Sequence, residues 1–198
     1  MMSELRDTGQ RPQRADARRS IAAVLDACVT LLGRRPDASM EEIARAAKVS
    51  RQTIYAHYPS RDALLQAVTC HVTAEVTREL SSLDLDEGSA VDALGRWVEC
   101  SWALLERYPI LLTPAIVAPT DDDERERHEP VIEGLLKLIE RGRRRGEFDS
   151  AMPTTWYIAA TIGLGHAAGQ EVTARRMTQA EAGAAFRKSV IRICRAAL

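Results

Sequence analysis

Apolar residues recur at helical spacing through most of this chain. Between residues 18 and 32 they fall three or four positions apart, as in Ile21, Val24 and Cys28, and Gly33 then provides a helix stop. Stripes of the same period along the rest of the sequence predict an all-α protein of about nine helices. The aromatic content of 5% agrees with this, because β-proteins are usually richer in aromatic residues.

Two short helices joined by a tight turn are predicted after residue 38. Ser39 and Glu42 have the spacing of a capping box, and Ser50 is a plausible N-cap for the second helix. Ala44 is small and lies midway along the first helix, so the second helix can approach closely. This pattern is typical of a helix-turn-helix motif. A helical hairpin with a polar face is the alternative that the spacing leaves open.

The second of these helices begins with side chains suited to DNA bases. Arg51, Gln52 and Thr53 are predicted to face outward, where arginine can bind guanine edges and glutamine can bind adenine edges in the major groove. Arg61 follows in the first turn of the next helix, where a cation opposes the helix dipole. A DNA phosphate held by Arg61, the helix N-terminus and the Ser60 hydroxyl would explain this position.

Residues 18 to about 68 resemble the DNA-binding domain of the tetracycline-repressor (TetR) family of transcription regulators. The resemblance is carried by the segment from Ser39 to Leu65, which includes IARAAKVSRQTIYAHYPSRDALL and is similar to the family signature in residue type and spacing. It implies a three-helix DNA-binding head on a larger helical body that binds a ligand and dimerises. The implied DNA-binding residues are Ser39, Ser50, Arg51, Gln52, Thr53, Tyr55, His57 and Arg61. By this resemblance Tyr55, His57 and Arg61 hold phosphates, and Ser39 adds another contact.

Two positions depart from the family pattern. Lys48 stands where many members have glycine in the turn, so either the turn avoids the left-handed backbone conformation or Lys48 adopts it. Arg61 stands where lysine is commoner, which keeps the charge and adds the option of bidentate phosphate binding.

The predicted organisation has three parts. A flexible arm covers residues 1–17, the helix-turn-helix domain covers residues 18–65, and a helical effector-binding and dimerisation domain covers residues 66–198. By analogy with the family, the last two predicted helices pair with those of a second subunit in a homodimer. A two-fold protein also suits a palindromic DNA operator.

Aromatic residues of the body are candidates for an effector pocket. The candidate lining residues are Trp97, Trp102, Tyr108, Trp156, Tyr157 and His166, with Glu99, Glu106 and Thr161 as possible polar anchors. Each of these side chains is also an ordinary core or surface residue, and that alternative stays open. The resemblance implies a small-molecule effector, apolar or amphipathic, whose binding shifts the protein toward a conformation that releases the operator.

Composition and cysteine spacing exclude several other classes. With 45% apolar and 28% charged residues the chain should fold, and no stretch approaches the roughly 20 apolar residues of a membrane span. No secretion signal is recognisable, so we expect a cytoplasmic protein without a membrane partner. The cysteines are far apart and predict neither disulfides nor a zinc site, and each is expected to be a small buried thiol; they are Cys28, Cys70, Cys100 and Cys194.

The charge is distributed unevenly. The net charge is −1, but residues 1–70 carry +3 and the remainder carries −4. This sign fits a head that binds a polyanion, although scattered surface charge explains it as well. The acidic run 121–124 and the basic run 141–145 match the dipole at the two ends of one predicted helix. We interpret them as solvated helix ends and not as a metal site or a second nucleic-acid patch.

One sequence pattern suggests an enzyme. Residues 163–168 fit the dinucleotide-binding pattern G-x-G-x-x-A, but only about 30 residues remain after them, and no Asp or Glu lies about 20 residues on at the end of a predicted strand. No other catalytic motif is present, so we predict a non-enzymatic protein without a cofactor or metal. The function predicted is a ligand-responsive transcriptional regulator, and repression is the commoner mode in the family. A helical protein-interaction module without specific DNA binding is the alternative.

Overall fold

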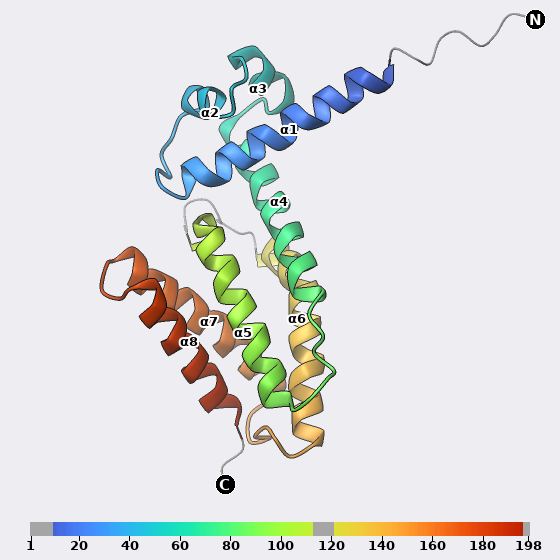
Figure 1. Ribbon diagram of the computed structural model, residues 1–198, viewed down its shortest axis with the longest axis vertical. Helices are drawn as coiled ribbons and strands as arrows, with labels where there is room; N and C mark the ends of the chain where they lie inside the picture. Colours follow the sequence, from blue (N-terminus) through green and yellow to red (C-terminus); the bar gives the residue numbers. More distant parts are fainter. Residues whose placement is uncertain (1–9, 113–120, 196–198) are drawn as a thin grey trace, which may run out of the picture. The chain divides into compact units, whose positions relative to one another are not determined.

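The computed structural model describes residues 10–112 and 121–195, and this part is helical (Figure 1). It contains eight α-helices and one 3₁₀ helix, close to the nine helices predicted. They are α1 (Gln10–Leu32), α2 (Met40–Ala46), α3 (Arg51–His57), α4 (Arg61–Ser81), α5 (Ala90–Arg107), η1 (Pro109–Leu112), α6 (Asp121–Arg144), α7 (Thr154–Thr173) and α8 (Gln179–Cys194). The all-α prediction is confirmed. No helix in the described ranges is long and apolar enough to cross a membrane.

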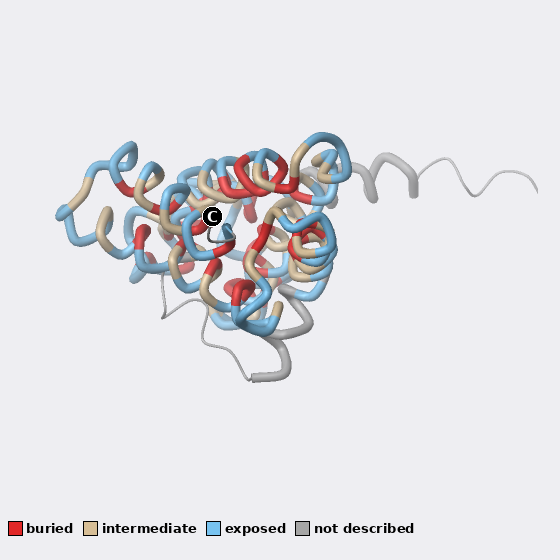
Figure 2. The backbone as a smooth tube through the Cα atoms, turned by 90° about the horizontal axis from the view of Figure 1, so that it is seen from below, coloured by how far each residue is buried: buried red, intermediate tan, exposed pale blue. Residues whose placement is uncertain are grey.

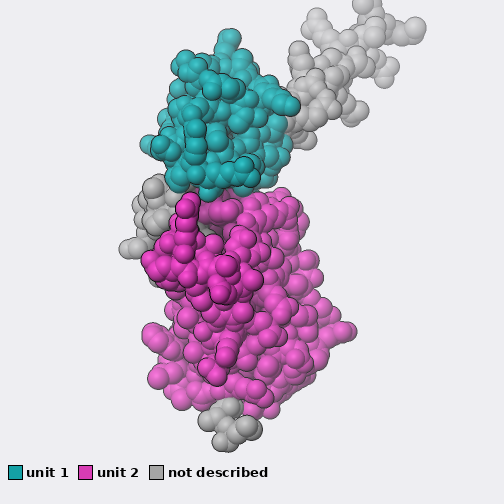
Figure 3. All heavy atoms as spheres, turned by 60° about the vertical axis from the view of Figure 1, so that its left-hand side comes forward, with its two compact units in different colours: residues 1–71 teal, residues 72–198 magenta. Residues whose placement is uncertain are grey.

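The chain divides into two compact units, residues 1–71 and residues 72–198 (Figure 3). The boundary therefore falls inside α4, six residues later than the predicted boundary after residue 65. Leu64, Leu65 and Val68 of α4 are buried, and His71 Nε2 lies 3.7 Å from Asp26 Oδ1 of α1. The first half of α4 consequently belongs to the first unit.

Helix α1 begins at Gln10, eight residues before the predicted start at residue 18. Residues 10–17 of the predicted arm 1–17 are thus helical, and residues 1–9 lie outside the described residues. Residues 10–17 are mostly alanine, arginine and glutamine, which are strong helix formers. Pro12 falls in the first turn, where proline is tolerated because its missing N–H would have no partner in the helix.

The first unit encloses a small core between α1, α2, α3 and α4. Its fully buried side chains include Val24, Cys28, Leu32, Ile43 and Ile54. Helices α2 and α3 have seven residues each, too few to be stable alone. Their stability therefore depends on their caps and on this shared core.

The second unit is built mainly from α5, α6, α7 and α8. The short connection between α7 and α8 makes them neighbours, and α5 packs against both α6 and α8. Leu94 and Val98 of α5, Ile139 of α6 and Val190 of α8 are completely buried. Figure 2 marks the buried and exposed stretches of each helix.

The four cysteines are free thiols that differ in exposure. Cys28 and Cys194 are buried, and burial raises the pKa of Cys28 to about 12 and that of Cys194 to about 11. Cys100 is half-buried and Cys70 is exposed, so the prediction that all four thiols are buried is wrong for these two. Cys70 points outward because its position on α4 lies off the stripe formed by Leu65, Val68 and Val72.

Candidate nucleic-acid interface

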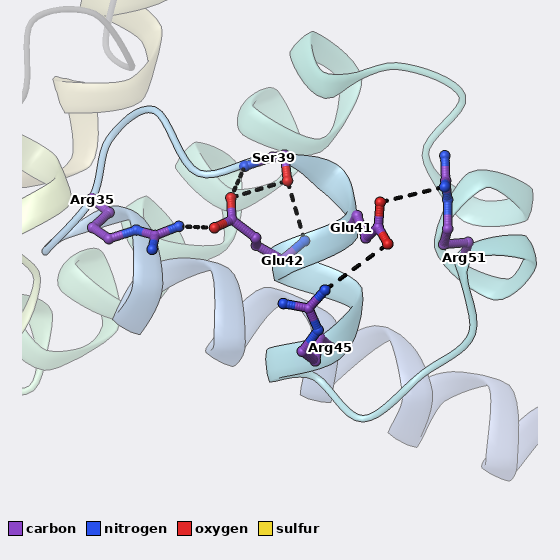
Figure 4. A network of polar contacts seen from close by, with 6 residues as sticks. All are labelled: Arg35, Ser39, Glu41, Glu42, Arg45 and Arg51. Atoms are coloured by element: carbon purple, nitrogen blue, oxygen red, sulfur yellow. Dashed lines mark hydrogen bonds and ion pairs between the residues drawn. The ribbon is translucent and has the colours of Figure 1, made fainter.

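The capping box at the start of α2 is present. Ser39 Oγ accepts a hydrogen bond from the Glu42 amide at 3.3 Å, and the Glu42 carboxylate accepts one from the Ser39 amide at 2.8 Å (Figure 4). The Ser39 amide, the Arg35 guanidinium and the Ser39 hydroxyl, in that order, lower the pKa of Glu42 from 4.5 to about 2. Because the folded pKa is the lower one, this contribution to stability is complete above pH 4.5 and is lost as the pH falls through about 2.

The turn between α2 and α3 passes through the left-handed backbone region at Lys48, where φ is 56°. Of the two alternatives left open by the sequence, Lys48 therefore adopts the conformation for which many relatives use glycine. The Val49 amide donates to the Ala44 carbonyl at 3.0 Å, which closes the turn around Lys48. A non-glycine residue held in this region costs about 1–2 kcal/mol.

Replacing Lys48 by glycine is expected to stabilise the protein by about 0.5–1 kcal/mol. The relief of backbone strain exceeds the extra entropy that glycine gains in the unfolded chain. The control is Ala46→Gly, two residues earlier in α2. Since φ is negative there, a glycine at this position should destabilise the protein. Thermal unfolding of both variants checks this, and a loss of stability in Lys48→Gly similar to that in Ala46→Gly would contradict it.

Helix α3 presents a polar, exposed surface on a fixed N-terminus. Ser50 caps it by accepting from the Thr53 amide at 3.0 Å, and the Ser50 and Thr53 hydroxyls share a hydrogen bond of 2.8 Å. Ile54 is fully buried and anchors the helix, while Arg51 and Gln52 are exposed. The predicted outward orientation of Arg51 and Gln52 is thus observed. Thr53 is only half-exposed because it takes part in the cap.

The predicted phosphate ligands differ in their surroundings. Tyr55 is 43% exposed and His57 is exposed, with its ring 6.4 Å from that of the buried Tyr58. Arg61 is half-buried, and its guanidinium donates to the carbonyls of Pro36 at 2.5 Å and Ala38 at 3.5 Å. These carbonyls give Arg61 a partner within the protein, a contact that the local sequence did not predict.

Glu41 is a residue of this interface that the sequence analysis did not single out. Its carboxylate lies 3.4 Å from Arg51 Nη1 and 3.9 Å from Arg45 Nη2 (Figure 4). The i, i+4 spacing of Glu41 and Arg45 on one helix could have indicated the contact between these two residues. The contact between Glu41 and Arg51 joins α2 to α3, so it depends on the three-dimensional structure of the turn.

The six candidate effector-pocket residues differ in burial. Trp97, Tyr108 and Tyr157 are buried in the core, and the Tyr157 hydroxyl donates to Asp149 Oδ2 at 2.7 Å. Trp156 is 59% exposed on α7, and His166 is exposed on the same helix. The candidate anchor Thr161 is fully buried and donates to the Tyr157 carbonyl. Trp102 lines a hollow in the described part of the chain.

This hollow lies between α5 and α8 and has a volume of about 300 Å³. It is lined by Val98, Glu99, Trp102, Glu106, Ala180, Gly183, Ala184 and Arg187. Trp102 Nε1 donates to Glu106 Oε1 at 2.7 Å, and Arg187 Nε lies 2.8 Å from Glu99 Oε1. The small residues on α8 make room for the indole, since a Cβ at Gly183 would lie 2.6 Å from Trp102 Nε1. The hollow thus combines an aromatic wall with two carboxylates and one guanidinium.

The basic run at the end of α6 is not merely solvated, which corrects the prediction. Arg141 donates to the carbonyls of Leu85, Asp86 and Gly88, and Arg143 donates to the loop that precedes α7. Backbone carbonyls of adjacent loops therefore bind these guanidinium groups, in addition to any effect of the helix dipole. The side chains of the acidic run 121–124 lie outside the described residues.

Sequence comparison identifies proteins that are similar to this chain. A family model described as bacterial regulatory proteins, tetR family, matches residues 24–68. The HTH-type transcriptional repressor LfrR of Mycolicibacterium smegmatis is 36% identical over 104 residues, which cover 50% of this chain and 53% of LfrR. The match thus spans about half the length of that relative. The HTH-type transcriptional regulator NfxB of Pseudomonas aeruginosa is 26% identical over 137 residues, covering 66% of this chain and 72% of NfxB.

Solved structures extend the similarity to most of the chain. The crystal structure of the TetR-like regulator LfrR from Mycobacterium smegmatis in complex with proflavine has a TM-score of 0.71 at 25% identity, covering 90% of this chain and 97% of that one. FadR from Bacillus subtilis in complex with stearoyl-CoA has a TM-score of 0.70 at 14% identity, covering 87% and 96%, which supports the fold alone. With its capped helix-turn-helix matched by the tetR family model over residues 24–68 and its helical second unit, the chain is similar to TetR-like transcriptional regulators.

Proposed function

We propose that this protein is a ligand-responsive transcriptional repressor of the cytoplasm that binds a palindromic operator as a homodimer. The observation that carries the proposal is α3, a short helix with a fixed N-terminus and an exposed polar surface. Its side chains match what the major groove offers, and the family model covers this segment. The proposal assigns no catalytic step to the chain.

The DNA contacts follow from the exposure of the side chains. Arg51 binds a guanine edge and Gln52 an adenine edge, while Tyr55 and His57 bind phosphates. Ser39 is exposed at the N-terminus of α2 and contributes its hydroxyl to the backbone. Three further predicted residues act from inside the motif. Ser50 and Thr53 fix the start of α3, and Arg61 holds the loop before α2 while it offers its charge to the DNA.

The homodimer is proposed to form through α7 and α8. Helix α7 exposes Trp156, Ala159, Gly163 and Ala167, which lie three or four positions apart on one side of the helix. Small residues next to one exposed tryptophan allow close packing of a second helix pair around a two-fold axis. A monomeric mass by light scattering at micromolar concentration would contradict this part of the proposal.

The effector site is proposed to be the hollow between α5 and α8, and its ligand a planar organic cation. Trp102 offers a flat aromatic surface, and Glu106 has no cationic partner among the ion pairs of the described residues. Proflavine, the molecule bound in the LfrR structure, is itself a flat aromatic cation. Binding at the hollow would favour one arrangement of α5 and α8 over another and thereby change operator affinity.

The proposed DNA binding is tested by fluorescence anisotropy. Duplexes from the DNA upstream of the protein's own gene are compared with a scrambled duplex at low and physiological salt. Gln52→Ala should reduce the preference for the operator about 10-fold, since a bidentate base contact contributes about 1–3 kcal/mol of discrimination. Gln66→Ala, at another exposed glutamine of the first unit, should leave it unchanged. Equal binding to both duplexes by the unsubstituted protein would favour the protein-interaction module instead.

The effector is tested in the same assay. Added proflavine should lower operator affinity, and Glu106→Gln should weaken that response while leaving operator binding without ligand unchanged. Glu140→Gln, at an exposed glutamate of α6, removes the same charge away from the hollow. A response to proflavine that is the same in both variants would contradict the assignment of the hollow.

A further inference from the structure

Glu41 occupies an unusual position for an acidic residue in a surface proposed to bind DNA. It lies in the first turn of α2, and its carboxylate faces Arg45 of the same helix and Arg51, the first residue of α3 (Figure 4). The exposed fractions of the three side chains are 54%, 74% and 65% in the order Glu41, Arg45 and Arg51. All three side chains are therefore accessible to solvent, and Arg51 is itself one of the proposed base-reading residues.

The contact between Glu41 and Arg51 adds little to the stability of the fold. Ion pairs between exposed side chains are screened by water and salt, and fixing two long side chains costs entropy. Glu41 also interacts favourably with the dipole of α2, whereas Arg51 at the first position of α3 is opposed by the dipole of its helix. These effects are modest, so the motif should fold without the Glu41 carboxylate.

The carboxylate has a larger effect when DNA approaches. Arg51 can bind either the edge of a guanine, which is uncharged, or a phosphate, which is anionic. A phosphate close enough to bind Arg51 comes near a carboxylate that lies 3.4 Å from the same guanidinium, so the two anions repel each other. A guanine edge meets no such repulsion. Discrimination between binding modes often depends on a repulsive element of this kind.

We propose that Glu41 is a positioning residue that holds Arg51 for base reading and penalises its contact with phosphates, so that it sets the sequence preference of α3. The inference rests on the proposed DNA-binding function and assigns a specific role within it. Arg45 shares the carboxylate and keeps it directed toward the start of α3. Removing the negative charge should therefore strengthen non-specific binding more than operator binding.

The test compares Glu41→Gln with Asp26→Asn in the full-length protein. Asp26 is an exposed carboxylate of α1 that faces His71, so its replacement makes the same charge change away from α2 and α3. Affinities for the operator and a scrambled duplex are measured between 50 and 200 mM salt. Glu41→Gln should bind the scrambled duplex about 5-fold more tightly at low salt. The slope of the logarithm of affinity against the logarithm of salt concentration should become steeper by the amount expected for about one more phosphate contact. Its operator preference should fall several-fold, and that of Asp26→Asn by less than 2-fold.

A double-mutant cycle shows whether Glu41 acts through Arg51. In an Arg51→Ala background, Glu41→Gln should change the operator preference no more than Asp26→Asn does. An equal loss of preference in both backgrounds would overturn the inference, as would an unchanged preference in Glu41→Gln alone. A wild-type protein without sequence preference would overturn the proposed function and this inference with it. If the wild-type protein prefers the operator and the Glu41→Gln variant keeps that preference in full, only the role of Glu41 would be overturned.

Discussion

Replacing Gly142 by alanine is expected to destabilise the second unit by about 1–3 kcal/mol. Gly142 lies on α6, and a Cβ at this position would overlap the ring of Phe148. The ring has little room to move, because Phe148 is buried and its amide donates to the Gly142 carbonyl at 3.3 Å. The next residue, Asp149, donates its amide to the Cys194 carbonyl at the end of α8. Overpacking of a core fixed in this way costs an amount in the stated range.

Gly134, on the same helix, provides the matched control. Apart from its chain neighbours and the adjacent backbone of α6, no heavy atom of the described residues lies within 4 Å of a Cβ built there. Gly134→Ala should therefore gain about 0.5–1 kcal/mol from the higher helix propensity of alanine. Urea unfolding of the two variants in the full-length chain measures both values. Effects of the same sign would contradict the close contact between Gly142 and Phe148.

Replacing Arg61 by alanine is expected to lower both stability and DNA affinity. The guanidinium donates to the carbonyls of Pro36 and Ala38, and hydrogen bonds from a charged donor contribute about 1.5–3 kcal/mol. Arg61 is only half-buried, so we expect a loss near the lower end, about 1.5 kcal/mol. Loss of the charge that is proposed to bind a phosphate should weaken binding to operator and scrambled duplexes alike.

Arg61→Lys separates the two roles of this residue. Lysine keeps the charge but lacks the planar group that reaches two carbonyls at once. Its affinity for DNA should therefore remain close to that of the wild type, while its unfolding temperature falls. Thermal unfolding and anisotropy at one salt concentration check both effects. An Arg61→Ala variant that unfolds at the wild-type temperature would contradict the role of Arg61 in holding the loop.

The helix-turn-helix could be predicted from sequence because its determinants are local. The capping box joins Ser39 to Glu42, and Ser50 caps a helix that starts at the next residue. Such contacts depend on residue type and on a spacing of three, both visible in one sequence. The end of the first unit depends instead on contact between α1 and α4, such as that of Asp26 with His71, and local patterns do not report it.

The lining of the proposed effector site was harder to predict because aromatic residues serve both cores and pockets. Trp156 and Tyr157 are adjacent in sequence, yet Trp156 is largely exposed while Tyr157 is buried. Which of the two faces inward is decided by how α7 packs on its neighbours. The hollow was also missed in part because three of its eight lining residues are small residues on α8, such as Gly183, which leaves space for Trp102.

The arginines at the end of α6 tie together two connections that are far apart in sequence. Arg141 of α6 and Arg145, the first residue after α6, bind carbonyls of the connection 82–89, and Arg143 of α6 binds carbonyls of the connection 145–153. Neither connection can loosen without breaking contacts to the same helical turn. We therefore expect their amide hydrogens to exchange with solvent as one cooperative group, whose opening follows the fraying of α6. A single helix end would then govern the local unfolding of both.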